Sequence, residues 1–209
     1  MNSGPTDAVI QKFVTGPLAT NSYIVYEKRS RKGILIDPGD HDPGIVKYIR
    51  DNKIEVCYSL NTHGHADHIF ACAEFGYPVL IHELDESYLG DTEKNLSGWL
   101  NESVKPIKAE RLLRDGDILA VGGLKFEIIH TPGHTPGSVS IKLRNTLFSG
   151  DTLFLGGIGR TDIPGGDHEA LMRSIKEKLM ALPDNTKVLP GHGPGTTIGY
   201  ERKNNPFLQ

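Results

Sequence analysis

The sequence feature that most constrains this chain is a run of three histidines and one aspartate within six residues. The run lies in Thr-His-Gly-His-Ala-Asp-His, residues 62–68. It follows Val56–Asn61, which predicts a buried strand, and it enters Ala66–Phe75, which predicts a short helix stopped by Gly76. A strand, a loop crowded with polar side chains and a helix therefore follow one another without a linker.

The polar side chains of this run fall into two groups. His63 and His65 are two residues apart in extended backbone, so they can point the same way. Asp67 and His68 lie in the first turn of the expected helix, where the chain can face a second point in space. Three imidazoles and one carboxylate suit borderline metals such as zinc, or iron and manganese. The run therefore predicts metal ligands.

Three later positions have a similar setting, in or next to a turn after an apolar strand. His134 lies in Thr-Pro-Gly-His-Thr-Pro-Gly, Asp151 follows Ser149-Gly150, and His192 lies in Pro-Gly-His-Gly-Pro-Gly. Proline and glycine restrict such loops, and loops on a rigid scaffold often carry functional groups. The predicted ligand set is therefore His63, His65, Asp67, His68, His134, Asp151 and His192.

The other histidines and the two cysteines carry no such signal. His41, His82, His130 and His168 are predicted to be surface, capping or packed structural residues. Cys57 and Cys72 are flanked by apolar residues and are expected to be small core residues. Two cysteines provide no disulfide framework, which favours a reducing compartment and a cytoplasmic location.

The rest of the chain predicts strands before helices in each half. The expected strands are Ala8–Val14, Ser22–Glu27, Gly33–Ile36, Tyr77–His82, Asp117–Val121, Leu124–His130, Ser138–Leu143, Thr146–Ser149 and Val188–Leu189. The expected helices are one capped by Asp42, Asp167–Met180 and a terminal turn at Ile198–Lys203, and Glu83–Lys108 is expected to be a partly helical insertion. This order predicts an α+β four-layer αββα sandwich, two sheets face to face with helices outside.

The bulk composition fits one soluble domain over residues 1–209. Hydrophobic residues make up 37% and charged residues 23% of the chain, which argues against disorder. A formal charge of −3 points to neither nucleic acid nor an anionic membrane surface as a partner. The N-terminal residues lack a signal-peptide pattern, and no apolar run approaches the ~20 residues of a membrane span.

Four motifs together resemble those of the metallo-β-lactamase superfamily: T-H-G-H-A-D-H, T-P-G-H-T-P-G, S-G-D-T-L-F and P-G-H-G-P. The resemblance is closest to short forms of glyoxalase II-like proteins (hydroxyacylglutathione hydrolases), and it runs from Asp37 to Phe207. It implies the metallo-β-lactamase fold and two divalent metal ions per chain, zinc first, with iron or manganese as alternatives. It also implies His63, His65 and His134 on one ion, Asp67, His68 and His192 on the other, and Asp151 bridging both. Asp37 would orient ligands from behind without binding metal.

The same resemblance implies a hydrolase that cleaves a small-molecule thioester such as S-lactoylglutathione. Two divalent ions, two aspartates and a bridging hydroxide leave a charge of +1 (4 − 2 − 1) if the five histidines are neutral. Such a site lowers the pKa of bound water toward ~7, so that hydroxide could attack the carbonyl while one metal stabilises the oxyanion. A thiolate whose parent thiol has a pKa of ~8.5 leaves with little acid assistance.

The thiol part of the substrate is less constrained. Full-length glyoxalase II has a helical domain after its last histidine, whereas 17 residues (209 − 192) follow His192 here, so we expect no C-terminal helical glutathione-binding domain. Arg160, Arg202 and Lys203 are then the candidates for binding substrate carboxylates. Alternatively, Arg160 braces its loop through Asp162 and the other two are solvated surface charges.

Other functions remain open at this point. A mononuclear iron persulfide dioxygenase of the same fold needs two histidines and a carboxylate, which His63, His134 and Asp151 can provide. A β-lactamase is disfavoured by the glyoxalase-like surroundings of His134 and of the C-terminus. A non-catalytic metal-binding or flavin-partnered module is disfavoured by the intact set of seven ligands. The sequence gives no oligomeric state.

Overall fold

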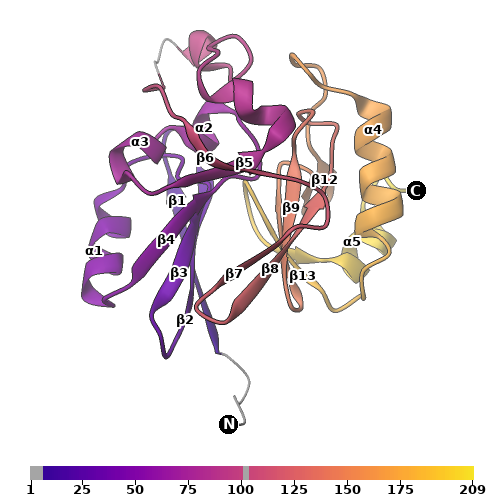
Figure 1. The fold of residues 1–209 in the computed structure, drawn as a ribbon. Helices are drawn as coiled ribbons and strands as arrows, with labels where there is room; N and C mark the ends of the chain where they lie inside the picture. Colours follow the sequence, from indigo (N-terminus) through magenta and orange to yellow (C-terminus); the bar gives the residue numbers. More distant parts are fainter. Residues whose placement is uncertain (1–6, 101–103) are drawn as a thin grey trace.

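Two six-stranded sheets face each other in the molecule, and helices cover the outer face of each (Figure 1). The computed structural model describes residues 7–100 and 104–209. Residues 1–6, and residues 101–103 of the expected insertion, lie outside the described part. The expected four-layer αββα sandwich is therefore confirmed. Within the described residues, no helix is long and apolar enough to cross a membrane.

The first sheet is built from the N-terminal half of the chain. Its strands, in spatial order, are β1 (Ala8–Thr15), β2 (Thr20–Glu27), β3 (Lys32–Ile36), β4 (Glu55–Leu60), β5 (Val79–His82) and β6 (Ala109–Leu113). Pairing is antiparallel from β1 to β3 and parallel from β3 to β6. The parallel strands are connected through α1 (Pro43–Asp51), α2 (Ala66–Ile69), α3 (Cys72–Phe75), η1 (Glu83–Leu89) and η2 (Ser97–Leu100).

The second sheet is built from the C-terminal half. Its strands, in spatial order, are β14 (Thr196–Thr197), β13 (Lys187–Pro190), β10 (Thr146–Gly150), β9 (Val139–Leu143), β8 (Leu124–His130) and β7 (Ile118–Val121). A separate two-stranded ribbon joins β11 (Leu153–Phe154) and β12 (Gly157–Ile158). The helical segments of this half are α4 (His168–Arg173), η3 (Ser174–Leu179, a π-helix) and α5 (Ile198–Asn204).

Strand alternation explains how each sheet buries both faces. In β2, Tyr23 and Val25 point into the core between the sheets, whereas Ile24 and Tyr26 point toward the α1 side. Tyr23 meets Phe148 of the second sheet, with ring centroids 5.1 Å apart. Full burial of a large apolar side chain contributes about 1.5–3 kcal/mol, so the inter-sheet core ties the two halves together.

The helix expected over Ala66–Phe75 is interrupted, which corrects the prediction. Continuation would require the amide of Ala71 to donate within the helix, but it donates to the carbonyl of Pro38 at 2.9 Å. The chain therefore forms α2 and α3, and α3 ends at Gly76 in the left-handed conformation, as predicted. The strand β6 and the short strands β11, β12 and β14 were not predicted, because none shows an alternating apolar run of its own.

Two helix starts agree with their predicted caps. The side chain of Asp42 accepts a hydrogen bond from the amide of Gly44, and Asp167 accepts one from Ala170 at 2.9 Å. Cys72 is buried as expected, whereas Cys57 is only partly buried. The predicted boundaries therefore hold where a local side chain fixes them.

Strand direction assembles the site at one edge of the sandwich. In the first sheet β3 and β4 are parallel; in the second, β10 is parallel to β13, and β8 shares this direction because both β8 and β10 are antiparallel to β9. The carboxyl ends of parallel strands meet at the same edge of a sheet. The residues that follow these five strands include Asp37, the His63–His68 segment, His134, Asp151 and His192.

Candidate metal centre

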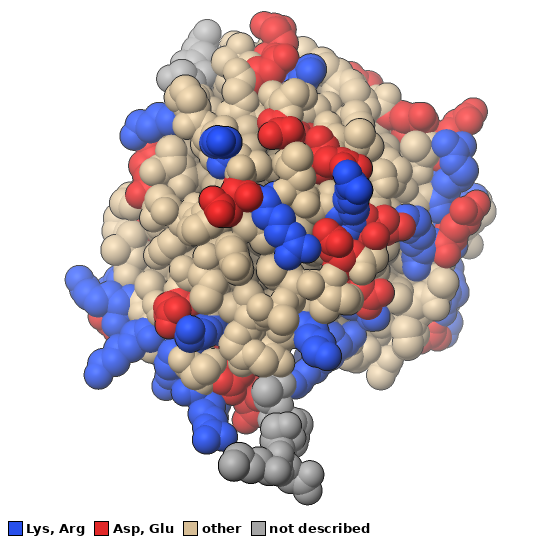
Figure 2. Space-filling view, in the orientation of Figure 1, with Lys and Arg blue, Asp and Glu red and all other residues tan. Residues whose placement is uncertain are grey.

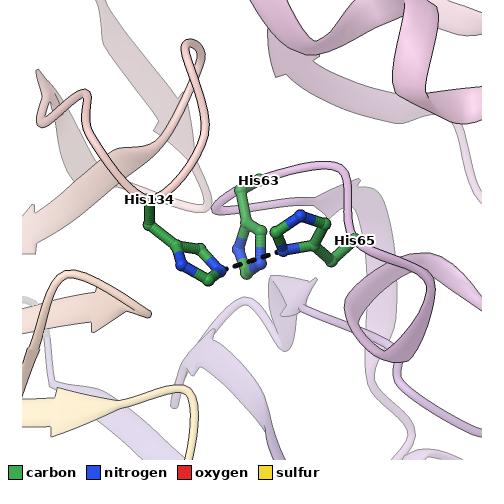
Figure 3. A group of neighbouring side chains, drawn as sticks. All are labelled: His63, His65 and His134. Atoms are coloured by element: carbon green, nitrogen blue, oxygen red, sulfur yellow. Dashed lines mark hydrogen bonds between the residues drawn. The ribbon is translucent and has the colours of Figure 1, made fainter. Parts of the chain in front are cut away.

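All seven predicted ligands meet in one cluster at this edge. His63 and His65 lie on the loop after β4, and His134 lies on the loop between β8 and β9 (Figure 3). The rings of His63, His65 and His134 converge, and the Nδ1 atom of His65 is 2.9 Å from the Nε2 atom of His134. The centroid of the His63 ring lies 4.8 Å from that of each of the other two. These three form one group of side chains that can hold an ion.

A second group lies beside the first. The Nε2 atom of His68 is 3.3 Å from the Nε2 atom of His192 and 3.4 Å from Oδ2 of Asp67. The Nε2 atom of His192 is 3.2 Å from the same Oδ2 atom. Asp67, His68 and His192 therefore form a second possible ion site.

Asp151 lies between the two groups. Its Oδ2 atom is 3.6 Å from Nε2 of His134 and 3.5 Å from Nε2 of His192. Its Oδ1 atom is 3.5 Å from Nε2 of His68. One carboxylate thus reaches the first group through His134 and the second through His68 and His192, the position that a bridging ligand needs.

The spacing of the donor atoms fits metal ions. Metal–nitrogen bonds of about 2.1 Å at tetrahedral angles place neighbouring ligand atoms about 3.4 Å apart. The separations given above run from 2.9 Å between His65 and His134 to 3.6 Å between His134 and Asp151. Among the described residues, the buried Nε2 atom of His63 and Oδ1 atom of Asp151 have no hydrogen-bond partner. Because buried polar atoms are rarely left unpartnered, these atoms fit a role as metal ligands.

Two histidines of the first group, His63 and His65, are kept neutral. Burial lowers the pKa of His65 to about 3, and the neighbouring His134 acts in the same direction. Burial, and then His68 and His65, also hold the pKa of His63 well below its ordinary value. Neutral imidazole is the form that binds metal, so these side chains are ready to bind at neutral pH.

The second group holds protons when no metal is bound. Burial acts to lower the pKa of His68, but Asp67 and Asp151 outweigh it and raise this pKa to about 9. Hydrogen bonds to Asp151 and Asp67 likewise outweigh burial at His192 and raise its pKa to about 11. Burial acts to raise the pKa of Asp67 and of Asp151, but His68, with His192, holds both below their ordinary range. A metal ion must therefore displace protons here.

Side chains and carbonyls behind the ligands fix their orientation. Oδ2 of Asp37 accepts hydrogen bonds from Thr62 Oγ1 at 2.7 Å and from Nδ1 of His68 at 3.0 Å. The Nδ1 atoms of His134 and His192 donate to the carbonyls of Arg160, at 2.8 Å, and Leu18, at 3.1 Å. Each bond leaves the opposite ring nitrogen for the cluster. Asp37 thus lies where the sequence placed it, in contact with a ligand and behind it.

The backbone of the His192 loop passes so close to other ligands that only glycine fits at position 191. A Cβ atom at Gly191 would lie 2.2 Å from Oδ1 of Asp151 and 2.7 Å from Cε1 of His68. The Pro-Gly-His-Gly-Pro-Gly loop therefore brings His192 to the site by passing directly over two other ligands.

A family comparison agrees with this geometry. The model of the metallo-beta-lactamase superfamily matches residues 15–192, which span the cluster from the end of β1 to its last histidine. This chain belongs to the metallo-beta-lactamase superfamily. Both the fold and the family expected from the four motifs are thereby confirmed.

Similar members of the superfamily have different names. Hydroxyacylglutathione hydrolase GloC of Haemophilus influenzae is 36% identical over 85% of this chain and 88% of its own. The crystal structure of BLEG-1 B3 metallo-beta-lactamase is 38% identical, covers 96% of this chain and 100% of its own, and has a TM-score of 0.86. The structure of TTHA1623 in a di-iron-bound form is 36% identical, covers 95% of this chain and 100% of its own, and has a TM-score of 0.83.

The three predicted substrate-binding cations differ in their contacts, and only Arg160 is bonded to a ligand here, through its carbonyl and His134 at 2.8 Å. Arg160 donates through Nε and Nη2 to the carboxylate of Asp162, both at 2.9 Å. Arg202 donates to the carbonyls of Met180 and Leu182, at 2.6 and 2.9 Å, and pairs with Asp184. Lys203 is exposed on α5. Both guanidinium groups brace local structure, and the assignment of the three cations to substrate binding stays a prediction.

The histidines that were not assigned to metal have structural roles. His82 caps η1 by accepting a hydrogen bond from Leu84 at 3.3 Å, and its ring stacks on His130 with centroids 4.1 Å apart. His41 packs against Phe75, with ring centroids 5.0 Å apart, and His168 is an exposed first residue of α4.

On the face shown in Figure 2, basic and acidic side chains are interspersed rather than gathered into one basic patch.

Residues that contact the ligands or their loops were missed from the sequence, among them Thr20, which donates to Oδ2 of Asp67 at 2.9 Å. Asp85 of η1 is fully buried and contacts both the His63–His65 loop and the loop that carries His134. Asp85 lies in the expected insertion Glu83–Lys108, whose polar sequence shows no regular spacing of apolar residues. The only signal was an acidic residue shortly after the strand that ends at His82, which is too common to indicate a role.

Proposed function

We propose that this protein is a binuclear metal-dependent hydrolase of small-molecule thioesters, of the hydroxyacylglutathione hydrolase type. The observation that carries the proposal is the place of Asp151 within 3.6 Å of His134 and 3.5 Å of His192, so that one carboxylate joins two ligand groups. The name of GloC supports a hydroxyacylglutathione as substrate. Zinc is the first candidate metal, and iron is the second because a similar structure is described as di-iron-bound.

The chain's own residues would prepare the site for carbonyl hydrolysis. When bound, two divalent ions supply Lewis acidity and make hydroxide available near neutral pH. Asp67 and Asp151 contribute two negative charges, and the buried His63 and His65 remain neutral, so a net positive charge faces the substrate oxygen. A thiolate leaves without a strong general acid because its conjugate thiol is itself acidic, with a pKa of ~8.5.

A cavity beside the second ligand group is suited to an uncharged part of the substrate. It has a volume of about 440 Å³, and Asp67 forms part of its wall. Pro17, Leu18 and Phe70 supply apolar surface, and the charged residues among its described lining, Asp40 and Asp67, are both acidic. We therefore propose that the cavity holds a neutral or apolar part of the thioester, and that glutathione carboxylates bind elsewhere.

We also propose that the protein works as one domain in a reducing, cytoplasmic setting. Cys57 and Cys72 are both free thiols, which supports that compartment. The described surface offers no single basic patch on the face of Figure 2, and this supports a small molecule rather than nucleic acid as partner.

The function is tested by parallel assays on protein of measured metal content. S-Lactoylglutathione hydrolysis, hydrolysis of a β-lactam and oxygen uptake with glutathione persulfide are followed on the same preparation. The proposal expects two ions per chain, thioester hydrolysis as the largest kcat/KM, and no oxygen uptake. One ion per chain with persulfide-dependent oxygen uptake would establish the dioxygenase instead, and β-lactam hydrolysis with the largest kcat/KM would reassign the substrate.

A further inference from the structure

The first ligand group depends on two loops from different sheets. His65 follows β4 of the first sheet, and His134 follows β8 of the second, 69 residues later, yet their ring nitrogens lie 2.9 Å apart. One backbone bond joins the loops at the His63 end, where the amide of Val139 donates to the carbonyl of Thr62 at 2.8 Å. Contacts beyond this bond set the separation of the two loops near His65 and His134.

One buried carboxylate contacts both loops. Oδ2 of Asp85 accepts a hydrogen bond from the backbone amide of Gly64 at 2.9 Å and from Thr135 Oγ1 at 2.7 Å. Its Oδ1 atom accepts one from the amide of Gly137 at 2.7 Å. Gly64 lies between His63 and His65 in the chain, and Thr135 directly follows His134. Asp85 thus links a point next to each histidine of the first group.

The surroundings leave Asp85 little freedom. Its side chain is fully buried and accepts hydrogen bonds from two backbone amides and one hydroxyl, so the carboxylate depends on these three bonds. A Cβ atom at Gly137 would lie 2.6 Å from the Asp85 amide nitrogen, and one at Gly64 would lie 2.3 Å from Cβ of Tyr88. The short helix η1 is therefore seated directly against both loops.

We propose that Asp85 is the positioning residue for the ion held by His63, His65 and His134. Asp37 bonds the ring of the ligand His68 itself, whereas Asp85 bonds residues that adjoin the ligands in the chain. Partners that orient metal ligands from behind typically change metal affinity by about 10–100-fold when they are removed. The inference rests on the proposed function only in that the cluster binds metal; it needs no particular substrate.

Asp85→Asn tests the proposal at nearly constant volume. Its amide NH₂ would face the N–H or O–H groups that now donate to a carboxylate, so at least one loop loses its hold. Two zinc affinities are measured by competition with a chromophoric chelator, and the visible spectrum of the cobalt(II) protein reports the geometry of each ion. We expect about a 10–100-fold weaker affinity and altered cobalt bands for the three-histidine group alone. The affinity of the group that contains Asp67 should stay within about twofold.

A matched control separates positioning from general stability. Glu201 is also a fully buried carboxylate with three donors: the amide of Gly156 at 2.9 Å, Thr196 Oγ1 at 2.6 Å and Asn205 Nδ2 at 2.8 Å. None of these three donors adjoins a ligand in the chain. Glu201→Gln should lower the melting temperature of the metal-free protein and leave both affinities and the cobalt spectrum unchanged.

A second variant keeps the test decisive if Asp85→Asn does not fold. Thr135→Val removes one of the three donors and should weaken the same ion by about fivefold, the effect of one ordinary hydrogen bond. Unchanged affinities and an unchanged cobalt spectrum in whichever variant folds would overturn the proposal, even if stability falls. A wild type that binds two ions and hydrolyses no thioester would refute the proposed function and leave this inference standing.

Discussion

The Nδ1 atom of His68 donates to Oδ2 of Asp37 at 3.0 Å, and both side chains are almost completely buried. This bond leaves Nε2 of His68 facing Asp67, Asp151 and His192. The same carboxylate also accepts two hydrogen bonds from Thr62, at 2.7 Å each, so the β3 end and the ligand loop are tied together. The orientation of His68 is thus set by a residue that belongs to neither ligand group.

Asp37→Asn is expected to weaken the ion of the second group selectively. Both oxygens of Asp37 now accept hydrogen bonds, whereas the NH₂ group of asparagine cannot accept one. The bond that fixes the tautomer and direction of the His68 ring is therefore weakened or lost. A loss of about 10–100-fold in affinity is expected for the ion bound by Asp67, His68 and His192. Chelator competition measures it, and equal losses at both ions would contradict a role confined to His68.

Metal binding is expected to release protons. The pKa values of about 9 for His68 and about 11 for His192 in the metal-free protein lie above neutral pH, so both rings are protonated there. Because only neutral imidazole binds metal, about two protons leave on loading, and affinity falls by up to about 100-fold per pH unit on acidification. Calorimetry in buffers of different ionisation enthalpy measures the number. A heat that does not depend on the buffer would contradict this description of the second group.

His82 is expected to make stability depend on pH away from the metal centre. Burial, followed by His130, lowers its pKa in the folded protein to about 4, whereas an unfolded histidine titrates near ~6.5. Below ~6.5 the unfolded chain binds a proton that the folded chain refuses, so the free energy of unfolding falls as pH decreases from about 6.5 to 4. The loss is on the order of 2 kcal/mol. Urea unfolding of wild type and His82→Asn across this range tests it, and identical pH slopes would rule it out.

Arg202 is expected to affect stability rather than substrate affinity. Its guanidinium group closes the end of η3 by bonding the carbonyls of Met180 and Leu182 and pairing with Asp184. Arg202→Ala should therefore lower the melting temperature and leave KM for S-lactoylglutathione unchanged, with Lys203→Ala as the exposed control on the same helix. A raised KM with an unchanged melting temperature would contradict this expectation and support the sequence-based assignment of this residue to substrate binding.

The ligand positions could be predicted because the signal is local. His63, His65 and His68 occupy one short segment. His134 and His192 lie in loops that the proline and glycine residues around them already indicate. Residues whose role depends on distant partners could not be found in the same way. Asp85 acts through Gly64 and Thr135, which are 21 and 50 residues away in the chain.

The same distinction explains the fold. Strands such as β2 and β8 carry their own apolar pattern, so their positions were predicted to within about two residues. The break between α2 and α3 depends on the carbonyl of Pro38 meeting the amide of Ala71, a contact that no local pattern contains. The ion pair of Arg202 could not be predicted for a related reason, since its partner Asp184 lies on a different segment.

The most direct test of the binuclear site is the metal content of fully loaded wild type beside Asp151→Ala. Asp151 lies within 3.6 Å of His134 and 3.5 Å of His68 and His192, so both ligand groups should depend on it. Elemental analysis is expected to give two ions per wild-type chain. Under a chelator challenge that leaves both ions on the wild type, Asp151→Ala is expected to lose both. One ion per wild-type chain, with His68 and His192 unliganded in a structure of the loaded protein, would contradict the binuclear hydrolase.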